Sequence, residues 1–273
     1  MSLNFLTCST TTRLKQPPPP MNHGPLQTLP SNISKAFQKV SRLDLSYNHL
    51  INVPDDLGNM KYNYLHLENN KLNNLPGNVW GNEHVFLFEL DNNNISAISP
   101  SISNSKTLTE LLISNNSLYE VTPQLLELDI VLFYADGNNL ESIPSEIGKA
   151  TSLQYLRFNN NNNISSIPDE IESLAQLVDF DIRNNAIGAL PTTFESLTSL
   201  ENVFLHNNPI CSNGWIDNIA SKKIQNLVNQ NGAGCKAQCS IYCQNFFKED
   251  QTCDNECNYA ACDYDGGACS ERR

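Results

Sequence analysis

The segment Val40–Leu50 reads VSRLDLSYNHL, and its pattern of aliphatic residues and one asparagine returns seven more times along the chain. The later copies are YNYLHLENNKL (62–72), VFLFELDNNNI (85–95), LTELLISNNSL (108–118), IVLFYADGNNL (130–140), LQYLRFNNNNNI (153–164), LVDFDIRNNAI (177–187) and LENVFLHNNPI (200–210). The pattern asparagines lie 22 to 24 residues apart, at Asn48, Asn70, Asn93, Asn116, Asn138, Asn161, Asn185 and Asn208. A fixed period of this length is typical of an architecture that stacks one structural unit per repeat.

Each unit divides into two halves with different expected structures. In the first half, apolar and variable residues alternate, as in a β-strand with one buried face. The asparagine that follows suits a turn where its amide satisfies buried backbone groups, so one asparagine per unit builds a ladder. The second half, for example LESIPSEIGKATSL (140–153), carries a proline and helix-spaced apolar residues. It favours a short helix or 3₁₀ turn.

The pattern resembles that of the leucine-rich repeat family over roughly residues 26–210. The resemblance implies an α/β solenoid of about eight repeats, with a parallel sheet on the concave face and short helices or 3₁₀ turns on the convex side. Each unit of such a stack buries its leucines only against its neighbours.

The two ends of the array differ. Cys211 and Cys235 flank a segment with helical spacing, so we expect a Cys211–Cys235 disulfide and a helical cap over 211–236. This arrangement resembles the cysteine-flanked C-terminal caps of extracellular leucine-rich repeats. The array begins in mid-unit, because residues 26–40 read as the convex half of a repeat whose strand is missing. An uncapped solenoid exposes its core. We therefore expect a fragment that lacks upstream repeats, with a disordered tail over 1–25.

Eight of the nine cysteines lie between Cys211 and Cys269. Six of them, at Cys239, Cys243, Cys253, Cys257, Cys262 and Cys269, form a module too small to fold without cross-links. Zinc is disfavoured because no histidine follows His206. The cysteines therefore predict disulfides and an extracellular or cell-surface location. No signal peptide is visible at the start, so a cytosolic chain with a reduced module stays the alternative.

Over residues 237–270 the cysteine spacing, with DGG in the last interval, resembles the Notch-type cysteine-rich repeat (LNR). The resemblance implies the pairs Cys239–Cys262, Cys243–Cys257 and Cys253–Cys269. It also implies a calcium site, for which Asp250, Asp254 and Asp265 are the candidate ligands. Ala268 stands where the family usually supplies a further aspartate, which weakens the site. A tight acidic turn is the alternative interpretation of DYDGG.

The outward positions of each predicted strand form a second candidate site. These positions are Arg42/Asp44, Tyr64/His66, Leu87/Glu89, Glu110/Leu112, Leu132/Tyr134, Tyr155/Arg157, Asp179/Asp181 and Asn202/Phe204. The middle of this set is apolar and aromatic, which favours an interaction surface. We define the concave strip as Tyr64, Leu87, Glu89, Leu112, Leu132, Tyr134, Tyr155 and Arg157, and predict that it binds a peptide or protein. Ordinary strand composition is the alternative.

The net charge of −12 argues against nucleic acid or an anionic membrane as partner, and no apolar run is long enough to span a membrane. A basic ligand is favoured electrostatically, although acidity also keeps secreted proteins soluble. No catalytic motif is present in the sequence. His66 near Glu68 and Glu89 could be an acid–base pair, but the favoured interpretation is that they are simply polar neighbours on an exposed surface.

Sequons at Asn32, Asn94, Asn115 and Asn163 permit glycosylation.

Together these features predict an extracellular recognition module that is not an enzyme and belongs to a receptor-like ectodomain. A membrane span or a kinase after Arg273 is an expectation for a longer product. A secreted structural or adhesive protein, or a secreted enzyme inhibitor, are the alternatives. The identity of the ligand and the oligomeric state do not follow from the sequence.

Overall fold

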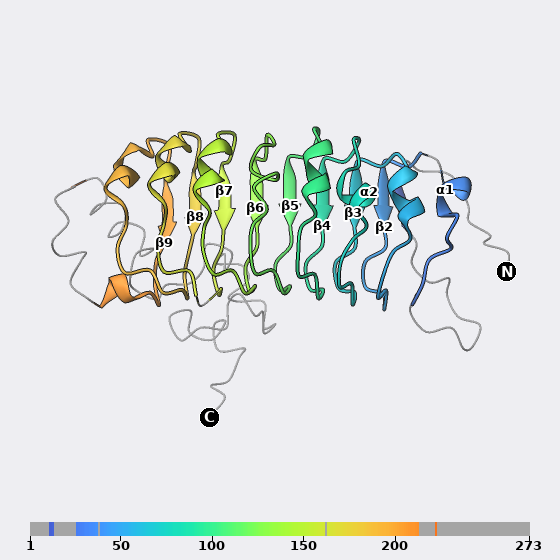
Figure 1. Ribbon diagram of the computed structural model, residues 1–273, viewed down its shortest axis with the longest axis horizontal. Helices are drawn as coiled ribbons and strands as arrows, with labels where there is room; N and C mark the ends of the chain where they lie inside the picture. Colours follow the sequence, from blue (N-terminus) through green and yellow to red (C-terminus); the bar gives the residue numbers. More distant parts are fainter. Residues whose placement is uncertain (1–10, 14–25, 38, 162, 213–221, 223–273) are drawn as a thin grey trace, which may run out of the picture.

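Three-residue strands stack side by side into one parallel sheet in the computed structural model, which describes residues 11–13, 26–37, 39–161, 163–212 and 222 (Figure 1). Within these residues the strand order follows the chain from β1 to β9. The strands are β1 (Thr11–Arg13), β2 (Arg42–Asp44), β3 (Tyr64–His66), β4 (Leu87–Glu89), β5 (Glu110–Leu112), β6 (Leu132–Tyr134), β7 (Tyr155–Arg157), β8 (Asp179–Asp181) and β9 (Asn202–Phe204). The predicted solenoid with a parallel sheet is confirmed.

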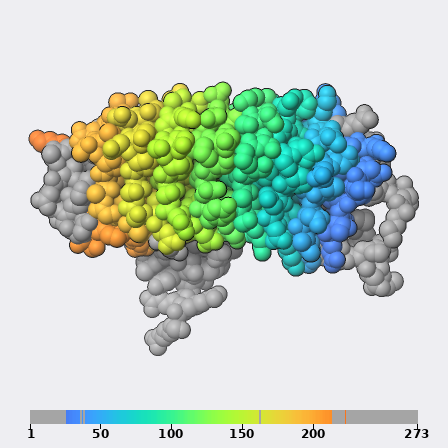
Figure 2. Space-filling model, viewed as in Figure 1, coloured from blue at the N-terminus to red at the C-terminus, as the bar shows by residue number. Residues whose placement is uncertain are grey.

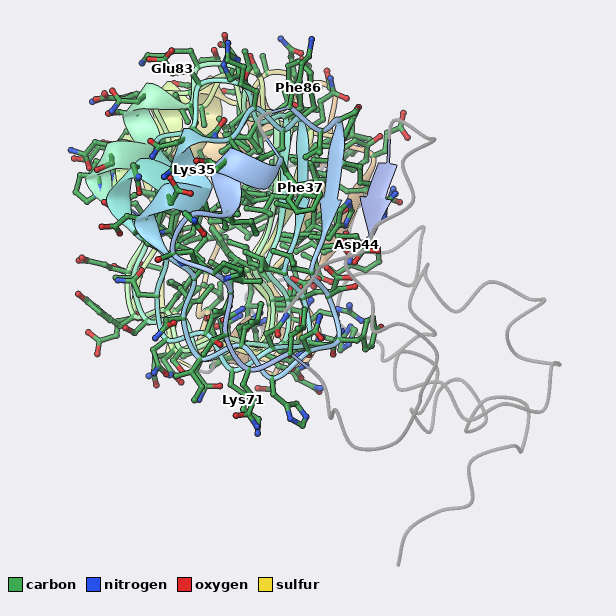
Figure 3. The ribbon with its side chains drawn as sticks, turned by 90° about the vertical axis from the view of Figure 1, so that its right-hand side faces the viewer. Lys35, Phe37, Asp44, Lys71, Glu83 and Phe86 are labelled. Atoms are coloured by element: carbon green, nitrogen blue, oxygen red, sulfur yellow. The ribbon has the colours of Figure 1, made fainter. Side chains whose placement is uncertain are left out.

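Short helical turns cover the opposite side from the sheet (Figure 3). Two are single-turn α-helices, α1 (Ile33–Ala36) and α2 (Gly77–Trp80). The others on this side are 3₁₀ turns, η1 (Asp55–Asn59), η2 (Pro100–Asn104), η3 (Ser145–Lys149), η4 (Asp169–Ser173) and η5 (Thr192–Ser196). A further 3₁₀ turn, η6 (Pro209–Cys211), directly follows the ladder asparagine Asn208 and lies apart from this row (Figure 1). Several of the 3₁₀ turns start directly after a proline, which is the N-cap residue in an extended conformation and has no N–H that would need a partner there.

The hydrophobic core runs the length of the stack, between the sheet and the convex turns. The middle residue of every strand from β2 to β9 is fully buried, as Leu65, Phe88 and Phe133 illustrate. Each unit also adds apolar residues from its turn, such as Ile147 and Ile171. In the space-filling view successive units form adjacent bands along the long axis (Figure 2). The core is therefore shared between neighbouring units, and no single unit closes one alone.

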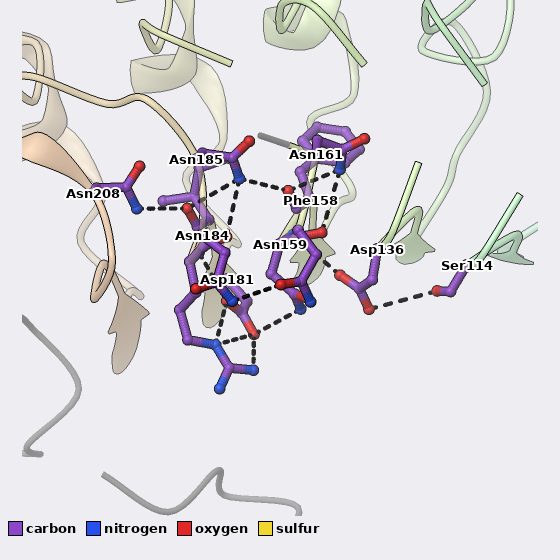
Figure 4. A network of polar contacts seen from close by, with 12 residues as sticks. Ser114, Asp136, Phe158, Asn159, Asn161, Asp181, Asn184, Asn185 and Asn208 are labelled. Atoms are coloured by element: carbon purple, nitrogen blue, oxygen red, sulfur yellow. Dashed lines mark hydrogen bonds and ion pairs between the residues drawn. The ribbon is translucent and has the colours of Figure 1, made fainter. Parts of the chain in front are cut away.

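The pattern asparagines form the predicted ladder. Asn138 is typical: its Oδ1 accepts from the backbone N–H of Leu118 at 2.9 Å, and its Nδ2 donates to the carbonyls of Ile113 and Ala135 at 3.0 and 3.1 Å. Each such amide ties its own unit to the preceding one and satisfies backbone groups that the turn would otherwise leave buried and unpaired. Ladder asparagines are themselves buried. Figure 4 shows three of them, Asn161, Asn185 and Asn208.

The residue before each ladder asparagine adopts a left-handed backbone conformation. Six of these residues are asparagines, which tolerate positive φ better than other side chains. Gly137 occupies this place in one unit with φ of 61°, and a Cβ there would collide with the side chain of Asn115. Several of the asparagines also bond to one another from unit to unit, as Asn115 Nδ2 does to Asn92 Oδ1 at 3.1 Å.

The N-terminal end differs from the prediction in one respect. Thr11–Arg13 form β1 and pair in parallel with β2, although the sequence predicts a disordered tail over 1–25. The strand β1 occupies the position of the strand that the first, incomplete unit otherwise lacks. The convex half of that unit is present as predicted: α1 lies within it, and the backbone N–H of Leu26 donates to Asn48 Oδ1 at 3.0 Å.

Candidate functional site

The concave strip lies on five adjacent strands, β3 to β7. Register places its members in two rows that cross the strands. The first row, with Glu110 between its apolar members, joins Tyr64, Leu87, Glu110, Leu132 and Tyr155. The second row joins His66, Glu89, Leu112, Tyr134 and Arg157. All eight predicted residues are thus neighbours on one face, because parallel in-register pairing sets equivalent positions side by side.

Aromatic residues dominate the β3 end of the first row. Tyr64 is 42% exposed, and its ring meets that of Phe86 edge to face, with centroids 6.4 Å apart. Phe86, the residue before β4, is itself 40% exposed. Phe86 is not among the predicted strip residues because it lies one position outside the alternating pattern. Two large rings held together at the surface give a partner a rigid apolar contact.

Four of the predicted outward positions are buried. Asp44, His66, Asp181 and Phe204 are at most 7% exposed, where the sequence predicts solvent-facing side chains. Asp181 is held by Arg183, whose Nη2 lies 2.6 Å from Asp181 Oδ2, and by Asn159 Nδ2 at 3.1 Å (Figure 4). An aspartate with these partners can be buried as an ion because its charge is paired and hydrogen-bonded.

Arg157 and Tyr134 pack together in the second row. The guanidinium carbon of Arg157 lies 3.9 Å from the centroid of the Tyr134 ring, which is a cation–π arrangement. Burial lowers the pKa of Arg157 and raises that of Tyr134. Arg157 holds the Tyr134 ring from one side, so this ring is a preorganised anchor on the strip.

A third row of outward positions runs beside the other two and was not predicted. It lies two residues before each ladder asparagine and reads Ser46, Glu68, Asp91, Ser114, Asp136, Asn159, Arg183 and His206. Glu68, Asp91 and Asp136, which we call the acidic row, lie beside the apolar part of the strip. Burial, followed by smaller contributions from neighbouring carboxylates, raises the pKa of Asp91 to about 6. The sequence could have identified this row, because the alternation of buried and outward positions continues for two residues beyond each strand.

Asp136 has the more strongly perturbed carboxyl group. Burial, and after it the charge of Asp181, raises the pKa of Asp136 to about 7. Its Oδ1 accepts from the backbone N–H of Asn159 at 3.2 Å, and its Oδ2 lies 3.5 Å from Ser114 Oγ (Figure 4). Because the folded-state pKa exceeds that of an unfolded aspartate, the folded state binds the extra proton between about pH 4 and pH 7.

We therefore predict that Asp136 makes the protein less stable as the pH rises from about 4 to about 7. Asp136→Asn keeps the shape and the acceptor oxygen but removes the charge. The variant should be more stable than the wild type at pH 8 and similar to it at pH 4. Urea unfolding of both proteins at the two pH values measures this difference. Equal stability differences at both pH values would contradict the assignment.

The predicted sites at the C-terminus fall largely outside the described residues. Cys211 is disulfide-bonded, but Cys235 lies outside them, so the Cys211–Cys235 pair stays a prediction. The described residues also exclude the cap over 211–236 beyond Ser212, apart from Lys222, together with the six cysteines of the 237–270 module and the calcium candidates Asp250, Asp254 and Asp265. Their pairing and calcium binding stay predictions.

Two further features bear on the predicted setting of the chain. All four sequon asparagines, Asn32, Asn94, Asn115 and Asn163, are exposed to solvent. Within the described residues, every helix is too short to cross a membrane.

Comparison with known proteins supports both parts of the sequence interpretation. The Notch LNR domain family model matches residues 234–270, and the leucine-rich repeat model matches residues 39–60 and 152–174. Among curated relatives, lumican of Coturnix japonica is 28% identical over 59% of this chain and 48% of its own length. Fibromodulin of Bos taurus is 30% identical over 50% of this chain and 38% of its own length. The chain spans less than half the length of these relatives.

Solved structures agree on the fold. The leucine-rich repeat ectodomain of the Arabidopsis receptor kinase HAESA, in complex with an IDA peptide hormone ligand, is 29% identical with a TM-score of 0.58. The match covers 67% of this chain and 32% of that one. A leucine-rich repeat protein of Leptospira interrogans, at 24% identity, gives a TM-score of 0.54 over 66% of this chain and 53% of that one. The chain therefore contains leucine-rich repeats, shares its fold with leucine-rich repeat structures, and matches the Notch LNR domain model over residues 234–270.

Proposed function

We propose that the protein is an extracellular recognition module whose concave strip binds a peptide or a protein. The observation that carries the proposal is the continuity of the strip. Tyr64, Leu87, Leu132 and Tyr155 lie at equivalent positions of a single parallel sheet, with Leu112 and Tyr134 in the next row. An apolar surface of this kind on a folded protein is typical of an interaction site.

The acidic row specifies the chemistry of the ligand. Glu68, Asp91 and Asp136 lie on the same face as the apolar rows, and the whole chain carries a net charge of −12. A ligand that pairs apolar or aromatic side chains with lysine or arginine meets both features. Charge complementarity speeds association and excludes acidic competitors. The proposed ligand is therefore a basic peptide or the basic segment of a protein.

An extended peptide suits the geometry of the strip. Equivalent positions repeat at about 4.8 Å from strand to strand, so five strands offer a line of contacts about 20 Å long. An extended chain advances about 3.3 Å per residue. Six or seven residues would then cover the strip from β3 to β7. The likeness to the peptide-bound HAESA ectodomain supports a peptide ligand of this kind.

The extracellular setting rests on the cysteine-rich C-terminal sequence and on the relatives. An LNR match over 234–270 is consistent with a compartment where disulfides persist. The proposed activity is binding, and catalysis is no part of it. A membrane-anchored receptor and a secreted protein both accommodate this activity.

A selection experiment tests the proposal. A library of random linear peptides is selected for binding to the oxidised full-length chain at physiological salt. We expect enrichment of peptides that combine aromatic or aliphatic residues with lysine or arginine, and binding that weakens as salt is raised. Enrichment of acidic peptides, or a selected pool with the composition of the starting library, would contradict the proposal.

A further inference from the structure

His66, Glu68 and Glu89 converge at the carboxyl ends of β3 and β4. His66 and Glu89 are register partners on the two strands, and Glu68 lies two residues after His66 on the same face. His66 Nδ1 lies 2.5 Å from Glu89 Oε2 and 3.9 Å from Glu68 Oε2. The ligating atoms of all three side chains lie within 4.8 Å of one another.

The cluster is partly buried, and parts of it have no hydrogen-bond partner. The side chain of His66 is only 7% exposed, that of Glu68 15% and that of Glu89 29%. Glu68 Oε2 is shielded from solvent and accepts no hydrogen bond, and His66 Nε2 is buried without a partner. Removing a carboxylate oxygen from water without a donor is costly, so a positive charge beside this oxygen would be stabilising.

Carboxylates outnumber the imidazole in this part of the sheet. Glu68 and Glu89 both lie near His66, and Asp91 follows Glu89 by two residues. A divalent cation between the imidazole and the two glutamates would offset the repulsion between their carboxylates.

The donor set selects the kind of cation. Calcium and magnesium prefer shells made entirely of oxygen, whereas an imidazole nitrogen beside two carboxylates suits zinc and its first-row neighbours. Ligands about 2.1 Å from a tetrahedral zinc ion are roughly 3.4 Å apart. The 2.5 and 3.9 Å separations in the cluster bracket this value, so small side-chain rotations would admit the ion.

We propose that His66, Glu68 and Glu89 form a binding site for a divalent transition metal ion, zinc by ligand chemistry. His66 Nδ1 supplies the nitrogen ligand, and each glutamate supplies one oxygen. Three protein ligands leave a fourth position for water or for a donor group of a bound partner. The site shares Glu89 with the concave strip and Glu68 with the acidic row, and His66 lies on the same strand as Tyr64. Zinc binding is measured without a ligand on the strip, so its failure is distinct from a failure of the proposed function.

Zinc titration of the oxidised full-length chain, with any free thiol alkylated, tests the site. Calorimetry should show one saturable site on the wild type. Glu89→Gln, Glu68→Gln and His66→Gln should each weaken it at least about tenfold, since even the loss of an outer-shell partner weakens metal affinity by 10–100-fold. Glu83→Gln and His84→Gln are matched controls at exposed positions and should bind like the wild type.

A second measurement covers variants that fail to fold. In the wild type, zinc should shift the ring-nitrogen resonances of His66 and leave those of the exposed His49 and His84 unchanged. Absence of saturable binding at millimolar zinc would overturn the proposal. So would wild-type affinity in the folded Glu89→Gln and His66→Gln variants, or a zinc-induced shift confined to another histidine.

Discussion

Replacing Asn138 by alanine is expected to lower the free energy of unfolding by about 3 kcal/mol. The substitution removes the acceptor for the backbone N–H of Leu118 and the donors to the carbonyls of Ile113 and Ala135. These groups lie in the interior of the stack, where water does not replace the lost partner. Each buried group left unpaired costs about 1–3 kcal/mol, and partial relaxation of the turn reduces the sum.

Asn139 provides the matched control. It follows Asn138 in sequence but is exposed, so Asn139→Ala should change the free energy of unfolding by less than about 0.5 kcal/mol. Urea unfolding followed by circular dichroism measures both variants against the wild type. Equal effects of the two substitutions would show that the hydrogen bonds of the Asn138 side chain do not stabilise the stack.

Replacing Tyr134 by alanine is expected to weaken binding of a selected peptide by about 30-fold, equivalent to about 2 kcal/mol. Tyr134 lies in the middle strands of the strip, and Arg157 packs against its ring at 3.9 Å. A ring already held in place loses little side-chain entropy when a ligand binds. Its removal also leaves Arg157 without the ring it packs on.

Tyr119→Ala is the control for this substitution. Tyr119 is 52% exposed and lies outside the strands, so the same change there should leave affinity within about twofold of the wild type. Fluorescence anisotropy with the labelled peptide compares the three proteins. Binding that is equally weak in both variants, or unchanged in Tyr134→Ala, would contradict the proposal that the peptide binds the concave strip.

The repeating part of the fold was predictable because each unit repeats the same physical requirement. Every strand from β2 to β9 lies at the predicted place, since alternation and the ladder asparagine together fix the register of each unit. The strand β1 was not predictable, because TTR at 11–13 carries no apolar alternation. Its position depends on pairing with the exposed edge of β2, which only the folded array presents.

The sequence predicted which residues of the candidate site lie together, but not which of them are buried. Parallel pairing placed the eight strip residues together, as the sequence implied. Burial depended on side chains of the same and the preceding unit: Asp181 is buried because Arg183 and Asn159 bond to it. The pairing of His66 with Glu89 likewise requires the register between β3 and β4. Sequence spacing identified the His66–Glu68–Glu89 group, but not that His66 is buried and lies against Glu89.

The central claim is that ligands bind the concave strip, and an oxidative footprint of the tyrosines tests it most directly. A selected basic peptide is bound at saturation, and hydroxyl-radical modification of each tyrosine is measured by mass spectrometry with and without it. We expect the peptide to protect Tyr64 and Tyr134 and to leave modification of the exposed Tyr47 and Tyr119 unchanged. Protection of Tyr47 or Tyr119, with Tyr64 and Tyr134 modified as in the free protein, would contradict the claim.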